Sequence, residues 1–141
     1  MDCTVAHIIF TGSRTWKCRS CVECMVQYSP TFTMYPPVIV HGGARGADTF
    51  AAESARGYGI PQAEYPYLSK FGKAGGHRRN TQMLVETKPL LVIAFRSPGV
   101  SPGTDDMVKQ AQKAGVIVWL VKCPQDGEIN PGHSPQVSIM D

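Results

Sequence analysis

The sequence has no long apolar run, few charged residues and no internal repeat. No hydrophobic stretch approaches the ~20 residues that a membrane-spanning helix needs, so no membrane partner is expected. Charged residues make up 18% of the 141 positions and the formal net charge is +3. That positive balance is too weak to predict a nucleic-acid surface. The N-terminus has no charged segment followed by a long apolar core, so no signal peptide is predicted.

Cysteines are also few, and their odd number, five, favours reduced thiols and a cytoplasmic protein over a disulfide framework. Three of them lie close together in Cys18-Arg-Ser-Cys21-Val-Glu-Cys24. Metal sites use such spacing, but a zinc site normally needs a second pair of ligands, and none follows here. Cys18, Cys21, Val22 and Met25 share one helical face, so we interpret these cysteines as core residues and predict no metal. Metal binding and thiol redox chemistry stay open as less favoured interpretations.

Hydrophobic patterning predicts strands that alternate with helices. Strands are expected at residues 5–10, 38–40, 60–65, 90–95 and 116–121, and helices at 16–28, 47–56, 105–114 and after the glycines near 75. This alternation predicts one Rossmann-like α/β domain over residues 1–124, with a mostly parallel five-stranded sheet and helices on both faces. Residues 125–141 are polar and contain Pro and Gly, which favours a tail that is disordered or docked on a partner subunit.

The most informative stretch, residues 38–48, is a short apolar strand followed by a glycine-rich turn and the start of a helix. Gly42, Gly43 and Gly46 leave no Cβ in the way of a ligand and tolerate positive φ. The free N–H groups and positive dipole end of the helix favour a phosphate. Asp48 either complements that dipole or contacts a ribose hydroxyl. A plain strand-to-helix turn is the alternative interpretation.

Two further loops follow predicted strands, at residues 11–16 and 97–106. The first offers the Ser13 hydroxyl and the forked cation of Arg14, unless Ser13 caps the next helix and Arg14 is solvated. The second leads into a helix whose first turn holds Asp105 and Asp106. Carboxyl ends of parallel strands meet at one edge of a sheet, so these loops and the glycine-rich turn are expected to share a crevice.

A basic segment, residues 70–83, also combines glycines with a helix start. Lys73, His77, Arg78 and Arg79 concentrate positive charge there, which suits an anion. A solvated basic patch is the alternative. His77 alone is weak evidence for acid–base chemistry.

Four motifs in this order resemble the YspA/YpsA-related (YAcAr) branch of the SLOG superfamily. They are Thr-Gly-Ser-Arg-x-Trp at 11–16, His-Gly-Gly-Ala-Arg-Gly-Ala-Asp at 41–48, Gly-Lys-Ala-x-Gly-x-x-Arg-Asn-x-x-Met at 72–83, and Gly-Thr-x-Asp-Met-Val at 103–108. The resemblance covers about residues 5–122. It implies a Rossmann-like fold that binds a nucleotide or nucleotide-derived ligand, in a superfamily found in bacteria and phages.

One branch of the superfamily, the LOG phosphoribohydrolases, cleaves the N-glycosidic bond of a modified adenosine monophosphate. By resemblance, Arg79 steers the phosphate or stabilises the leaving group, and Asp106 takes the place of the catalytic Glu. A carboxylate there would stabilise an oxocarbenium-like centre or orient water. Asn80 and Asp106 replace the Lys and Glu of that branch, so binding is favoured over hydrolysis. A third hypothesis, a single-stranded DNA accessory factor, is disfavoured by the weak positive charge.

The prediction is therefore a sensor or sequestering protein for a nucleotide or an ADP-ribose-like ligand, with Arg79 and Asp106 as catalytic candidates if the ligand is hydrolysed. The predicted ligand-binding residues are Gly12, Ser13, Arg14, Trp16, His41, Gly42, Gly43, Ala44, Arg45, Gly46, Asp48, Lys73, Gly76, Arg79, Asn80, Met83, Phe95, Gly103 and Thr104. No cofactor is expected beyond that ligand. LOG-type relatives form dimers, so a homodimer or higher homo-oligomer is expected.

Overall fold

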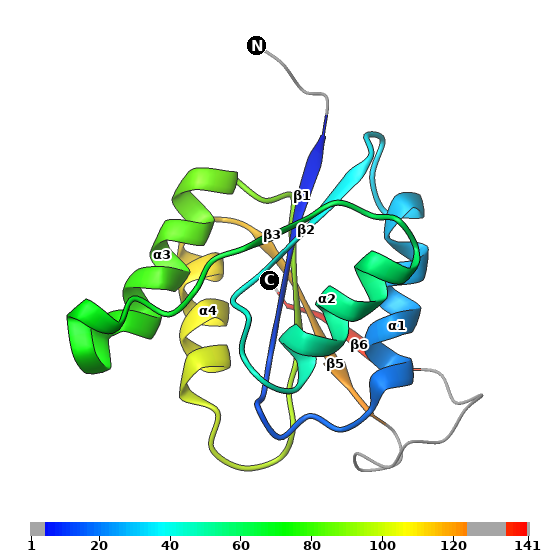
Figure 1. Cartoon of the computed structure of the whole chain (residues 1–141). Helices are drawn as coiled ribbons and strands as arrows, with labels where there is room; N and C mark the ends of the chain where they lie inside the picture. Colours follow the sequence, from blue (N-terminus) through cyan, green and yellow to red (C-terminus); the bar gives the residue numbers. More distant parts are fainter. Residues whose placement is uncertain (1–4, 124–134, 141) are drawn as a thin grey trace.

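The computed structural model describes residues 5–123 and 135–140. Within them lies one six-stranded sheet of order β3-β2-β1-β4-β5-β6 (Figure 1). The strands are β1 (Ala6–Gly12), β2 (Pro37–His41), β3 (Gln62–Glu64), β4 (Leu91–Phe95), β5 (Ile117–Lys122) and β6 (Gln136–Met140). The strands β1 to β5 pair in parallel, whereas β6 runs antiparallel to β5.

The helices cover both faces of the sheet, two on each face (Figure 1). They are α1 (Arg19–Tyr28), α2 (Ala47–Gly57), α3 (Gly75–Thr87) and α4 (Pro102–Lys113), with short 3-10 helices η1 (Ser29–Thr31) and η2 (Ser69–Ala74). Side chains of α1 and α2 form one buried cluster with the sheet, and side chains of α3 and α4 form the other. In these clusters, alternate residues of each central strand contact opposite helix layers.

The central strands are apolar because both of their faces are covered. All five residues of β4 are buried, and it pairs with β1 from Ile8–Leu91 to Gly12–Phe95. The rings of Phe10 and Phe95 stack with centroids 5.7 Å apart. This pairing fixes the ends of β1 and β4 side by side, which brings the loops that follow them together.

The α/β class and Rossmann-like topology are confirmed, but the predicted strand count of five is corrected to six. The added strand, β6, falls in the segment predicted as a tail. Its apolar residues Val137 and Ile139 alternate with polar ones, a pattern hidden by the polar residues before it. Of that predicted tail, residues 125–134 and 141 lie outside the described residues.

Two predicted helix boundaries also shift. The first helix begins at Arg19 rather than Trp16, because the Trp16 indole donates to the Cys18 carbonyl at 2.8 Å and lies in the preceding turn. The last predicted helix, α4, begins at Pro102 rather than Asp105, which is consistent with proline's preference for the first helical position. Across the two described segments, no helix combines the length and apolar character needed to cross a membrane.

Candidate ligand site at the strand ends

A cavity of about 440 Å³ lies beyond the carboxyl ends of β1, β2 and β4. From β1 the chain proceeds to β2 on one side, whereas from β4 it proceeds to β5 on the other. Open α/β sheets bind ligands at such a switch point. The lining residues of this strand-end cavity are Thr11, Gly12, Arg14, Thr15, Ala44, Asp48, Tyr67, Lys73, Gly76, His77, Arg79, Val100, Ser101, Pro102, Gly103, Thr104 and Asp106.

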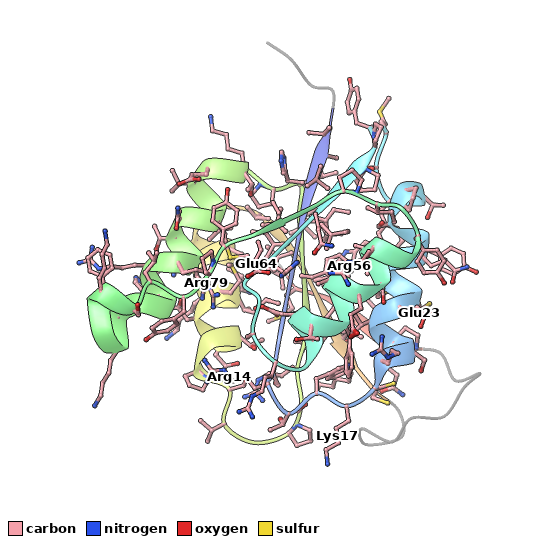
Figure 2. The ribbon with its side chains drawn as sticks, viewed as in Figure 1. Arg14, Lys17, Glu23, Arg56, Glu64 and Arg79 are labelled. Carbon is pink, nitrogen blue, oxygen red and sulfur yellow. The ribbon has the colours of Figure 1, made fainter. Side chains whose placement is uncertain are left out.

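A second hollow of about 340 Å³ adjoins the strand-end cavity. The two share Arg14, Ala44, Tyr67 and Arg79, and the second adds Gly42, Gly43, Arg45, Glu64 and Pro66. Figure 2 labels Arg14, Glu64 and Arg79, which come from three different segments of the chain. The crevice predicted from the loops is therefore present, and it is divided into two parts around these arginines.

Arg79 connects α3 to the glycine-rich loop. Its Nη1 donates to the carbonyl oxygens of Gly42 at 3.0 Å and Tyr65 at 3.2 Å. Burial lowers the pKa of Arg79, and the nearby Asp48 carboxylate partly offsets that shift. The guanidinium keeps its charge, since arginine is not deprotonated in proteins. Arg79 thus braces the loop while it lines both hollows.

Asp48 braces the same loop from the start of α2. Its buried Oδ2 accepts hydrogen bonds from the backbone N–H of Gly42 at 2.9 Å and Ala44 at 3.4 Å. Burial raises the pKa of this carboxyl, although the two N–H donors and the charges of His41 and Arg79 oppose the shift. The side chain is thus engaged in shaping its own loop.

The glycines of residues 42–46 are packed against protein atoms. A Cβ at Gly42 would overlap the Arg79 guanidinium. Gly43 and Gly46 have φ of +72° and +79°. A Cβ at Gly46 would lie 2.5 Å from the Ser13 carbonyl oxygen. At Gly46 the loop therefore needs glycine to let two segments of the backbone pack closely.

A second polar cluster, formed by His77, Asn80, Asp106 and Gln110, joins α3 to α4. His77 Nδ1 lies 2.6 Å from Asp106 Oδ1. Asp106 Oδ2 accepts from Asn80 Nδ2 at 2.9 Å and Gln110 Nε2 at 2.8 Å. Burial alone would raise the pKa of Asp106, but these hydrogen bonds outweigh it and lower the pKa. Both carboxylate oxygens are held in place at the wall of the strand-end cavity.

Buried hydroxyl groups tie the first loop to the last. Ser13 Oγ donates to Ser101 Oγ at 3.0 Å, and Ser101 Oγ donates to Thr104 Oγ1 at 3.0 Å. Ser13 Oγ also accepts from the Ser97 backbone N–H at 3.0 Å. This chain of hydroxyls fixes the separation of the two loops across the end of the sheet.

The predicted site residues separate into three groups. Those that line the strand-end cavity are Gly12, Arg14, Ala44, Asp48, Lys73, Gly76, Arg79, Gly103, Thr104 and Asp106. Gly42, Gly43 and Arg45 line only the adjoining hollow. Those that contact the loops or the core instead are Ser13, Trp16, His41, Gly46, Asn80, Met83 and Phe95.

The core and support residues have identifiable partners. Trp16 packs edge-on against Phe95 with ring centroids 5.5 Å apart. Met83 is a residue of α3 and is buried in the core cluster between that helix, α4 and the sheet. His41 Nε2 lies 2.7 Å from Gln62 Oε1, and its Nδ1 accepts from the Gly43 N–H at 3.1 Å. These side chains hold the fold of the site, because their polar atoms and rings are directed at other residues of the chain.

Several cavity residues were missing from the predicted site, chiefly His77, Tyr67 and Ser101. His77 precedes Asn80 by three positions on α3, so the two share a helix face. The three-residue spacing between His77 and the predicted site residue Asn80 was the sequence signal that could have placed His77 at the site. No sequence pattern places Tyr67 at the cavity, because it lies in an irregular segment before η2.

Solved structures resemble this fold at low sequence identity. DprA, the DNA processing protein A of Streptococcus pneumoniae, superposes with a TM-score of 0.62 and 19% identity over 82% of this chain. TM1055 superposes with a TM-score of 0.57 and 14% identity over 79% of this chain. The molybdenum cofactor carrier protein of Chlamydomonas reinhardtii superposes with a TM-score of 0.55 and 16% identity over 86% of this chain. This chain covers 50%, 71% and 79% of those three chains, so it spans only half of DprA.

Those likenesses show the fold that this chain shares with all three: a Rossmann-like α/β domain. No protein-family model matches the chain. The Gene 61 protein of Mycobacterium phage D29 is 36% identical over 118 residues, which cover 79% of this chain and 93% of the phage protein. The chain belongs to the family of that phage Gene 61 protein.

Proposed function

We propose that this protein binds a nucleotide or nucleotide-derived ligand in the strand-end cavity. The observation that carries the proposal is the cavity of about 440 Å³ at the switch point of the sheet, with Arg14 and Lys73 at its wall. Both side chains are exposed, and neither forms an ion pair with another described residue. Two cations that the fold itself does not neutralise suit a phosphate-bearing molecule.

The start of α4 adds backbone donors at the same wall. Ser101, Pro102, Gly103 and Thr104 all line the strand-end cavity, and they span the N-cap and first turn of the helix. Pro102 has no N–H, so the donors at this wall are the N–H groups of Gly103 and Thr104, which have no partners within the helix and lie at the positive end of its dipole. A phosphate held there, between α4 and Arg14, would place the rest of a nucleotide along the cavity.

The four sequence motifs favour the YspA/YpsA-related branch within the superfamily. Binding without turnover fits a sensor or a sequestering protein, and a phage relative is compatible with either role. The structure of the glycine-rich loop supports binding indirectly, because its bracing by Asp48 and Arg79 fixes one wall of the cavity.

Titration calorimetry with AMP, ADP and ADP-ribose tests the proposal. Replacing Arg14 with Ala is expected to weaken binding by about tenfold or more, since a charge-assisted hydrogen bond contributes ~1.5–3 kcal/mol. Lys17→Ala is the matched control, because Lys17 is exposed on the same loop but lines a different cavity. Equal affinity in both variants would contradict the proposed site. Salt-sensitive binding of single-stranded DNA alone would favour the DNA accessory hypothesis instead.

Hydrolysis of an N-glycosidic bond is a second candidate, supported by the contact between His77 and Asp106 at the cavity wall. In such a reaction water bonds to the anomeric carbon, the bond to the base breaks, and the base leaves with a proton. The ionised Asp106 would stabilise the positive charge that develops on the sugar. His77, oriented through Nδ1, would exchange a proton through its other ring nitrogen.

Chromatography of nucleoside monophosphates incubated with the protein tests this candidate. Hydrolysis would be supported if the parent protein released free base and the Asp106→Asn variant did not, although the variant bound the ligand with unchanged affinity. Lys109→Gln, a change of charge on the exposed surface of the same helix, should leave the release unchanged. No release by the parent across the panel would rule the candidate out for those substrates.

A further inference from the structure

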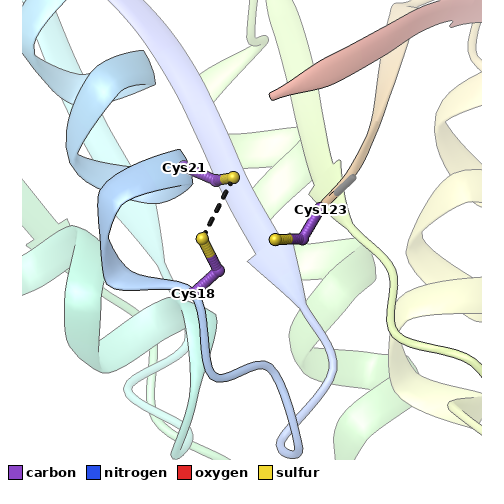
Figure 3. A group of neighbouring side chains, drawn as sticks. All are labelled: Cys18, Cys21 and Cys123. Atoms are coloured by element: carbon purple, nitrogen blue, oxygen red, sulfur yellow. Dashed lines mark hydrogen bonds between the residues drawn. The ribbon is translucent and has the colours of Figure 1, made fainter. Parts of the chain in front are cut away.

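Three cysteines from two distant parts of the chain converge on the face of the sheet covered by α1 and α2. The sulfur atoms of Cys18, Cys21 and Cys123 lie within 4.8 Å of one another (Figure 3). Cys18 is the N-cap of α1, Cys21 lies in its first turn, and Cys123 directly follows β5. The Cys18 thiol donates to Cys21 Sγ at 3.2 Å. The sequence prediction of no metal rested on the absence of a further pair of ligands close after Cys24. The fold brings one further possible ligand, Cys123, from the end of β5 to Cys18 and Cys21.

The spacing of these sulfurs suits a thiophilic metal ion. Tetrahedral zinc with thiolate bonds of ~2.3 Å separates its sulfurs by about 3.8 Å. The sulfur separations here, from 3.2 Å to at most 4.8 Å, bracket that value. Cys-x-x-Cys is also a common spacing for one half of a zinc site. Small side-chain adjustments would therefore complete three of the four bonds.

The surroundings of the sulfurs fit a site with one open position. Cys18 and Cys21 are fully buried, whereas Cys123 also lines a cavity of about 790 Å³. Lys17 and Lys122 line the same cavity, where they would offset the single negative charge of a zinc ion with three thiolates.

We propose that Cys18, Cys21 and Cys123 bind Zn²⁺ as three thiolate ligands, with the fourth position reached from the cavity that Cys123 lines. This site is separate from the strand-end cavity, because none of the three cysteines lines that cavity. Each thiol releases its proton to solvent as the sulfur–metal bond forms, so binding needs no oxidant or reductant.

Cobalt titration of the reduced, metal-free protein tests the proposal without reference to nucleotides. Three thiolates should give a sulfur-to-cobalt charge-transfer band that saturates at one ion per chain and is displaced by Zn²⁺. Cys123→Ser should weaken cobalt binding by at least about tenfold, as expected for the loss of a ligand. Cys24→Ser is the matched control: Cys24 lies on the same helix but outside the cluster.

Absence of the charge-transfer band in the parent protein would overturn the proposal. It would also fail if the band survived unchanged in a folded Cys123→Ser variant or disappeared in Cys24→Ser. Should Cys123→Ser not fold, as judged by circular dichroism, the parent spectrum and its stoichiometry decide the question. A Cys18–Cys21 disulfide that forms readily in a protein that takes up no cobalt when reduced would also contradict zinc binding.

Discussion

The two glycine-containing loops at the strand ends, residues 41–48 and 97–106, have opposite surroundings. In the first, a Cβ at Gly43 would lie 2.7 Å from Glu64 Oε2, and one at Gly46 would lie 2.5 Å from the Ser13 carbonyl oxygen. In the second, a Cβ at Gly99 or Gly103 would have no atom of residues 5–123 or 135–140 within 4 Å. A Cβ at these glycines of the first loop would therefore meet other parts of the chain, whereas one at Gly99 or Gly103 would face open space.

The carboxylates at the ends of these two loops, Asp48 and Asp106, also differ in their surroundings. Asp48 is buried and binds backbone N–H groups of its own loop, and burial raises its pKa. Asp106 keeps 26% of its side chain exposed at the cavity, and its hydrogen bonds lower its pKa. Both loops line the site, but the carboxylate of the first is engaged in holding its own loop, whereas the carboxylate of the second stays partly exposed at the cavity. Three predictions test this contrast.

The largest expected effect is on stability. Gly46→Ala combines a strained left-handed φ, which costs ~1–2 kcal/mol, with a steric overlap that costs ~1–3 kcal/mol. Gly59→Ala has a similar φ of +67° but open space around the Cβ, so only the strain should remain. Urea unfolding measures both. Equal losses in the two variants would contradict the view that close packing fixes the first loop.

The second prediction concerns ligand affinity at the open loop. Gly103→Leu adds a side chain at a residue that lines the cavity and whose Cβ would meet no described atom within 4 Å. We expect nucleotide binding to weaken about tenfold or more, ~1.4 kcal/mol, while stability changes by less than ~0.5 kcal/mol. Gly57→Leu is the control, an exposed position with equally open space at the end of α2. Affinity that stays unchanged in Gly103→Leu would move the ligand away from this wall.

The smallest effects are in the pH dependence of stability, with opposite signs for the two carboxylates. Asp106 has a lowered pKa, so its contribution to stability is present above the ordinary value of 3.8 and is lost as pH falls through its folded pKa. Asp48 has a raised pKa, so its contribution is present below 3.8 and is lost as pH rises through its folded pKa.

Unfolding free energies of Asp106→Asn and Asp48→Asn, measured from acid to neutral pH, test these signs. Relative to the parent, the deficit of Asp106→Asn should grow as pH rises, whereas that of Asp48→Asn should shrink. Parallel pH profiles for the two variants would show that both carboxylates have equivalent surroundings.

The sequence predicted the fold better than the site. Alternating apolar strands and helices fixed the class and the parallel order, because each buried strand needs two covered faces. The glycines indicated close approach, but the approaching group at Gly46 is the chain itself. His77 and Cys123 gain their significance only from partners on other elements. Pattern along the chain does not encode such pairings, because tertiary packing brings the partners together.

Native mass spectrometry of the protein purified from cells, with release and identification of any bound small molecule, tests the central claim most directly. The account predicts an unmodified nucleotide-like adduct, present in the parent and Gly57→Leu proteins and depleted in Gly103→Leu. A parent protein that carries no adduct, and that gains none on addition of AMP, ADP or ADP-ribose at ~1 mM, where even weak ligands bind, would contradict it.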